Sequence, residues 1–218
     1  MKTKDLAAPL VIFAHGLGDS GYSGTDYARA FARQGYSAYT FDFNHGTFSD
    51  DMTKMSIFTE RDDLNTVVDH FKEQGYQNIY LLGASQGGVV SAMVAAQRDD
   101  IRGLMLLYPA FVIPDMMHDL FPRQDFPTTF NLMDMTLGRE YVKDLPGYDL
   151  LGTVSKYQGP VLIFHGTRDP YVPIHYSQRA VAMYPHAHLI TVQGAGHGFY
   201  GHQEKAVTAD LIDFIKVH

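Results

Sequence analysis

Short apolar runs alternate with amphipathic segments along most of this chain, and this alternation limits its fold more than any other feature. The apolar runs are rich in β-branched and aromatic residues and are bounded by turn residues, which predicts strands. They occupy residues 9–14, 37–43, 78–82, 101–108, 160–164 and 188–193, and helical patterns follow at 23–34, 60–74, 86–97, 175–184 and 203–217. Such an order is typical of a mostly parallel sheet with helices on both faces, an α/β fold. In these sheets, chemistry gathers beyond the carboxyl ends of the strands.

The segment 111–150 interrupts this rhythm. It carries four prolines and four of the ten methionines, with aromatic residues at no steady period. Because it lies between two predicted strands, we expect it to be a lid insertion within a single domain that spans residues 1–218. Its Met and aromatic side chains fit either a plain core or an adaptable pocket wall, and we favour the wall because Met packs around varied ligands.

Composition excludes several classes of function. Lys and Arg number 17 against 24 Asp and Glu, a formal net charge of −7, which argues against nucleic acid and anionic membranes as partners. The chain has no cysteine, so disulfides, thiolate nucleophiles and thiolate metal sites are excluded. Its first apolar run meets His15 and Gly16 rather than a small-residue cleavage site, and no run approaches the length of a membrane span. We therefore expect a cytoplasmic protein.

The strand at 78–82 runs directly into Gly83-Ala84-Ser85-Gln86-Gly87 and then into a helical pattern. The pattern G-x-S-x-G alone is modest evidence, since a glycine-rich turn also produces it. Its setting of strand, tight turn and helix is the one that a nucleophilic serine requires. The following helix also directs backbone N–H groups at the reaction partner of the serine. We predict that Ser85 is a nucleophile.

Two further strand ends carry the groups that a nucleophilic serine needs. Asp169 follows the strand at 160–164 within "HGTRDPYVP", and His197 follows the last strand within "GAGHGF". A serine hydroxyl needs a base, and the base needs an orienting carboxylate. The chain order serine, aspartate, histidine at three strand ends predicts a triad of Ser85, Asp169 and His197.

Acyl transfer also needs N–H donors for the developing oxyanion. Gln86, directly after the serine, supplies one candidate backbone N–H. Leu17, which follows His15 and Gly16 in the loop after the first strand, supplies the other.

These motifs together resemble the serine α/β-hydrolase superfamily over essentially the whole chain, and within it the bacterial cinnamoyl and feruloyl esterases. "FDFNHGTFSDD", "GASQGG", "LGREYVKDLPGYD" and "GAGHGF" look like that group's versions. The resemblance implies an α/β-hydrolase fold with a shortened N-terminal edge, no cofactor, and an insertion that closes over an aromatic acyl group. It also places Tyr141 as a contact of that acyl group. Asp125 and Asp134 could also reach a phenol, but we expect them to be solvated charges on the surface of the lid.

The sequence leaves alternatives to the feruloyl esterase open. A short-chain acyl or monoacylglycerol esterase would use the same triad, and a hydrolase-like binding module would bind a small molecule without turning it over. His186 and His188 form H-x-H, but no third ligand lies at a convincing spacing, so we predict no metal site. The expected partner is a small ester substrate, and a homodimer stays open.

Overall fold

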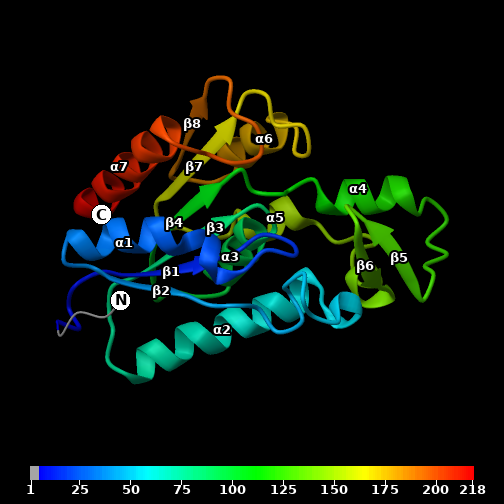
Figure 1. Cartoon of the computed structure of the whole chain (residues 1–218), viewed down its shortest axis with the longest axis horizontal. Helices are drawn as coiled ribbons and strands as arrows, with labels where there is room; N and C mark the ends of the chain where they lie inside the picture. The colour runs from blue at the N-terminus through cyan, green and yellow to red at the C-terminus, as the bar shows by residue number, and fades with distance from the viewer. Residues whose placement is uncertain (1–4) are drawn as a thin grey trace.

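The computed structural model of the protein describes residues 5–218 and contains the expected parallel sheet (Figure 1). Its strands are β1 (Leu10–Ala14), β2 (Ser37–Thr40), β3 (Ile79–Ala84), β4 (Ile101–Leu107), β7 (Val161–Gly166) and β8 (Ala187–Val192). They lie in the order β2-β1-β3-β4-β7-β8, and every neighbouring pair is parallel. Within the described residues, β2 forms one edge with no strand outside it, as the shortened edge predicts.

Helices cover both faces of this sheet. They are α1 (Thr25–Arg33), α2 (Ile57–Glu73), α3 (Gln86–Ala96), α4 (Ile113–Leu120), α5 (Leu150–Val154), α6 (His175–Met183) and α7 (His202–Val217), with short 3₁₀ helices η1 (Gly21–Gly24), η2 (Met52–Lys54) and η3 (Arg139–Tyr141). The apolar side chains of α1 and α7 pack on one face, and those of α2, α3 and α6 pack on the other. The predicted α/β-hydrolase architecture is confirmed.

The strands β1, β3 and β7 are continuous apolar runs because both of their faces are buried. In β1, Ile12 packs toward α2 and α3, whereas its neighbour Phe13 packs toward α1 and α7. Every residue of β1, β3 and β7 is buried. Such strands need apolar side chains at successive positions, and this produces runs rather than alternation.

Two predicted boundaries differ from the structure by three residues, more than the others. The helix expected at 60–74 begins at Ile57, because Ser56 and Thr59 form a capping box in which each side chain bonds the other's backbone N–H. The strand expected at 37–43 ends at Thr40, after which the chain leaves the sheet toward η2.

The insertion 111–150 contains ordered structure that the sequence does not predict. It holds α4, η3 and a separate antiparallel hairpin of β5 (Thr129–Leu132) and β6 (Met135–Gly138), and it stands at one end of the molecule (Figure 1, right). The two hairpin residues Met133 and Asp134 both have positive φ, 50° and 64°. This backbone usually takes Gly or Asn, so the turn carried no recognisable signal.

Candidate active site

Ser85 sits on a strained turn between β3 and α3. Its φ of 53° and ψ of −118° lie in a region that side chains rarely adopt. A Cβ on Gly83 would lie 2.3 Å from the carbonyl oxygen of Gly87, and one on Gly87 would lie 2.3 Å from those of Ala14 and His15. The glycines flanking the serine are therefore needed for the strand, the helix and the first loop to approach one another.

The structure brings the three predicted triad residues together. Nε2 of His197 lies 2.8 Å from Oγ of Ser85, and Nδ1 of His197 lies 2.7 Å from Oδ2 of Asp169. Asp169 follows the carboxyl end of β7 and His197 follows that of β8, at the same edge of the parallel sheet as the carboxyl end of β3. This chain of hydrogen bonds is the arrangement in which an imidazole removes a serine proton while a carboxylate fixes its tautomer.

Asp169 is held as a buried carboxylate. Its Oδ1 accepts hydrogen bonds of 2.9 Å from the backbone N–H groups of Tyr171 and Val172, and Nε2 of His165 lies 3.4 Å from its Oδ2. Burial alone would raise its pKa, but hydrogen bonds from His165, His197 and the Val172 N–H together hold the pKa well below its usual range. The carboxylate thus stays charged beneath the histidine.

The predicted oxyanion donors flank the serine. A Cβ on Gly16 would lie 3.1 Å from Cβ of Ser85, so the loop after β1 runs directly against Ser85. Within residues 5–218, the backbone N–H groups of Leu17 and Gln86 donate to no protein acceptor. Both donors are available beside Ser85, as an oxyanion hole requires.

His15 holds this loop in place. Its side chain is buried, Nδ1 lies 2.8 Å from the carbonyl oxygen of Gly16, and Nε2 accepts the N–H of Phe43 at 3.1 Å. Burial lowers its pKa. A neutral ring that donates from Nδ1 and accepts at Nε2 satisfies both bonds, so His15 supports the loop and is not a base for the serine.

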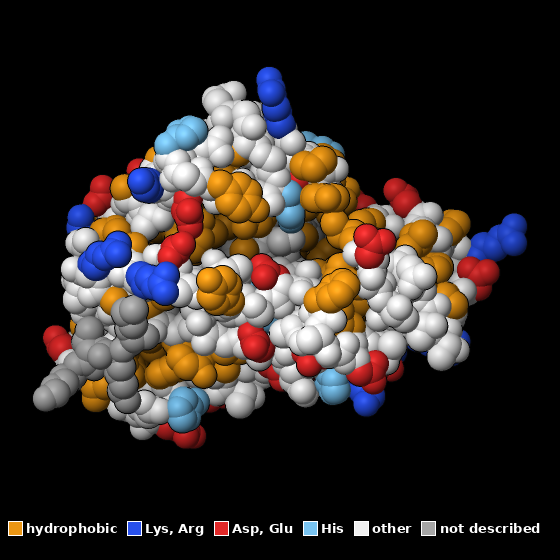
Figure 2. Space-filling model, viewed as in Figure 1, with side chains coloured by type: hydrophobic (Ala, Val, Ile, Leu, Met, Phe, Trp, Pro, Cys, Tyr) orange, Lys and Arg blue, Asp and Glu red, His pale blue; other side chains and the backbone are white. Residues whose placement is uncertain are grey.

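A hollow of about 400 Å³ opens over Ser85 and His197. The space-filling view shows it between the main α/β body and the insertion (Figure 2). One wall comes from the insertion and is apolar, with side chains of Val112, Ile113, Met116, Leu132, Met133, Met135 and Tyr141. The opposite rim is more polar and includes Asp19, Tyr108, Tyr171 and Tyr200. The hollow therefore offers an apolar side for an acyl group and a mixed side for the alcohol.

Tyr141 lines this hollow, but its side chain is almost wholly buried, with 1% exposed. Its hydroxyl donates to Oε1 of Gln86 at 2.7 Å, and Nε2 of Gln86 donates to Oε2 of Glu60 at 2.8 Å. Asp125 and Asp134 are exposed and do not line the hollow.

Glu60 was not identified from the sequence. It lies on the buried face of α2 in line with Leu64, Val68 and Phe71, so the signal was an acidic residue within an apolar stripe.

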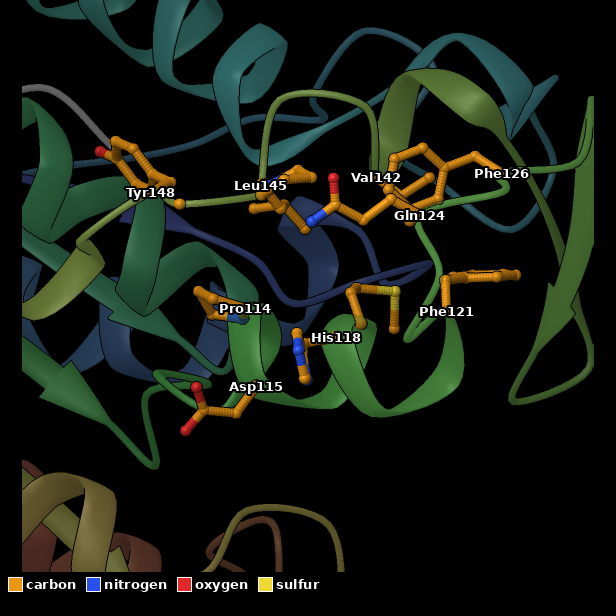
Figure 3. A pocket seen from close by; sticks show the side chains of 12 residues that line it. Pro114, Asp115, His118, Phe121, Gln124, Phe126, Val142, Leu145 and Tyr148 are labelled. Carbon is orange, nitrogen blue, oxygen red and sulfur yellow. The ribbon is translucent and has the colours of Figure 1, made fainter.

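A second, smaller hollow of about 190 Å³ lies between α4 and the chain from Val142 to Tyr148 (Figure 3). His118 of α4 and Phe121, which follows that helix, line it, and it shares no lining residue with the hollow over Ser85. Across the described chain, no group of three or more His, Asp or Glu residues is arranged to hold a metal ion. Nor does any helix in residues 5–218 have the length and apolarity to cross a membrane.

Comparison with known proteins agrees with this geometry. A family model described as "Alpha/beta hydrolase family" matches residues 11–211. The chain belongs to the alpha/beta hydrolase family. No curated protein matches its sequence.

The solved structures similar to this hydrolase include esterases and lipases. Est1E from Butyrivibrio proteoclasticus with ferulic acid bound is 27% identical, with a TM-score of 0.86 over 96% of this chain and 90% of that one. A monoacylglycerol lipase from Paleococcus ferrophilus is 15% identical, with a TM-score of 0.77 over 96% and 95%, and shows the shared fold. Family and neighbours together support a carboxylic ester hydrolase of the esterase and lipase type.

Proposed function

We propose that this hydrolase is a serine carboxylesterase for small carboxylic esters, with hydroxycinnamoyl (feruloyl-type) esters as the preferred substrates. The observation that carries the proposal is the hydrogen-bonded series Ser85, His197 and Asp169 at the base of a hollow with an apolar wall. Residues 1–218 would act as one domain, with 111–150 as its lid, in the cytoplasm. Residues 1–4 lie outside the described structure.

In this mechanism, Oγ of Ser85 attacks the ester carbonyl while Nε2 of His197 takes its proton. The N–H groups of Leu17 and Gln86 bind the oxyanion, and each such donor contributes about 3–4 kcal/mol to the transition state. His197 then gives the proton to the departing alcohol, and Asp169 stabilises the charged imidazole meanwhile. Water enters, His197 activates it, and the acyl-enzyme is hydrolysed.

The insertion wall supports the choice of acyl group. Its Val, Ile, Leu and Met side chains fit a flat apolar ring, and Met adapts its shape to the ligand. The Tyr141 hydroxyl donates to Gln86, so its oxygen is left to accept a hydrogen bond from a phenol. Est1E, which binds ferulic acid, is similar over nearly the whole chain.

The same wall also favours a second candidate, a short-chain acyl or monoacylglycerol esterase. No charged side chain from the insertion lines the hollow, so an alkyl chain would be accommodated as well as a ring. The two candidates differ in whether a phenolic hydroxyl improves turnover.

The test compares kcat/KM for methyl ferulate, methyl cinnamate, p-nitrophenyl butyrate and a monoacylglycerol. A kcat/KM for methyl ferulate that is at least as high as that for p-nitrophenyl butyrate, and higher than that for methyl cinnamate, would support a feruloyl esterase with a phenol contact. Turnover of only butyrate or the glyceride would replace it with the second candidate. If no ester reacts, a non-catalytic binding protein becomes the better reading.

Ser85→Ala should abolish turnover of every ester, and full activity in that variant would overturn the mechanism. Ser91→Ala is the matched control. Ser91 lies in the same helix, it is fully buried, and its hydroxyl has no hydrogen-bond partner within the described part of the chain. Its removal should leave activity unchanged.

A further inference from the structure

Three buried polar side chains from three separate elements meet beneath the nucleophile. Glu60 belongs to α2, Gln86 is the first residue of α3, and Tyr141 ends η3 in the insertion; all three are at most 1% exposed. The Tyr141 hydroxyl donates to Oε1 of Gln86 at 2.7 Å, and Nε2 of Gln86 donates to Oε2 of Glu60 at 2.8 Å. None of the three side chains has a part in the mechanism above.

This arrangement fixes the amide of Gln86 at both ends. Glu60 holds the Nε2 end of the amide and Tyr141 holds the Oε1 end, so the Gln86 side chain is tied at both ends. Because Gln86 begins α3, its own backbone N–H has no partner within the helix and points out beside Ser85. The side chain and the proposed oxyanion donor therefore belong to one immobilised residue.

Glu60 is held in the neutral form. Burial, with a smaller contribution from Asp63, raises its pKa to about 8 against the opposing hydrogen bond from Gln86. Asp63 lies one turn along α2, and Tyr141 is the titratable group that faces Glu60 from the insertion. Gln86 faces it from α3 without charge, and Gly46 approaches from the loop before α2, where a Cβ would lie 3.1 Å from Oε1. Ionisation would place an unpaired charge behind Gln86.

We propose that Glu60 and Tyr141 are positioning residues that hold the Gln86 peptide in the oxyanion hole. The packing of the insertion against the rest of the fold then determines how strongly that hole stabilises the oxyanion. The inference rests on the proposed esterase function. It gives the insertion a second role, since its Tyr141 acts through Gln86 on the chemical step as well as lining the acyl side of the hollow. A hydrogen bond that served only stability would not change the rate of that step.

The first test compares Tyr141→Phe with Tyr157→Phe. Both remove a buried hydroxyl that donates one hydrogen bond; that of Tyr157 goes to the carbonyl oxygen of Ile101 at 3.0 Å, away from Ser85. Complete loss of an oxyanion donor costs 10²- to 10³-fold in kcat, so a displaced one should cost about tenfold. We expect Tyr141→Phe to lower kcat for p-nitrophenyl butyrate about tenfold with KM within about twofold, and Tyr157→Phe to lower neither.

Inhibition by phenylboronic acid sharpens this test, because the inhibitor forms a tetrahedral adduct on serine and uses the oxyanion hole. Its Ki should rise about tenfold in Tyr141→Phe and stay unchanged in Tyr157→Phe. A Tyr141→Phe enzyme with native kcat and native Ki would overturn the inference while leaving the esterase function intact. If the native protein turned over no ester, that result would instead overturn the proposed esterase function.

The second test is the pH profile of Glu60→Gln, which keeps the shape and neutrality of the acid. Native kcat should fall above about pH 8 as Glu60 ionises, whereas the variant cannot ionise there. The ratio of variant to native kcat should therefore rise about tenfold between pH 7 and pH 9.5. A ratio that stays constant over that range would overturn the role of Glu60, and the Tyr141→Phe arm stays decisive if Glu60→Gln does not fold.

Discussion

The turn around Ser85 and the insertion 111–150 face each other across one hollow, but they are packed in different ways. Residues 83–88 are all buried except Ser85 itself, and the chain there packs backbone against backbone. The insertion carries exposed apolar side chains such as Leu120 and Met133, and within residues 5–218 its two strands pair only with each other. The geometry around Ser85 is thus fixed by the backbone, whereas the insertion wall of the hollow is made of side chains that can change without moving the backbone.

The largest effect should come from the carboxylate on the rigid side. Asp169→Asn keeps the size of the side chain but loses the charge that selects the imidazole tautomer, so kcat should fall about 10⁴-fold with little change in KM. Asp115→Asn is the control, since that carboxylate accepts a hydrogen bond from the Tyr176 hydroxyl of α6 and does not line the hollow over Ser85. A fall of less than tenfold in Asp169→Asn would mean that another group orients His197.

The contrast in packing predicts that glycine-to-alanine substitutions in the two regions lower the free energy of unfolding by different amounts. Gly87→Ala would put a Cβ 2.3 Å from two carbonyl oxygens, so it should lower the free energy of unfolding by more than about 4 kcal/mol or prevent folding. Gly147→Ala in the insertion meets nothing within 4 Å and is strained only by its φ of 73°, so about 1 kcal/mol is expected. Urea denaturation measures both, and equal losses would contradict the distinction between the two regions.

The same contrast explains what the sequence could predict. The juxtaposition of the three predicted triad residues could be predicted because each follows a strand of the parallel sheet, and parallel strands end at one edge of the sheet. Ser85, Asp169 and His197 needed no knowledge of side-chain packing to be placed near one another.

The insertion was not predictable in the same way. Its hairpin turns at Met133 and Asp134, which lack the residues that mark such a turn. The partner of Tyr141 lies 55 residues away in the sequence, on an element whose contact with η3 only tertiary packing decides. Glu60 was visible as an acid in an apolar stripe, but the pattern does not reveal which amide it would meet.

The smallest expected effect lies on the acyl wall, and it separates substrate choice from chemistry. Met133 and Met183 are similarly exposed, at 48% and 45%, but only Met133 lines the hollow. Met133→Ala removes part of one apolar contact, about 1 kcal/mol, so kcat/KM for methyl ferulate should fall about fivefold through KM. The same variant should change turnover of the shorter p-nitrophenyl butyrate by less than about twofold, and Met183→Ala should change neither. A fall in kcat for both esters would mean that the hairpin influences the turn around Ser85 directly. Met133 would then contribute to the chemical step as well as to substrate binding, and the distinction between the two regions would not hold for this residue.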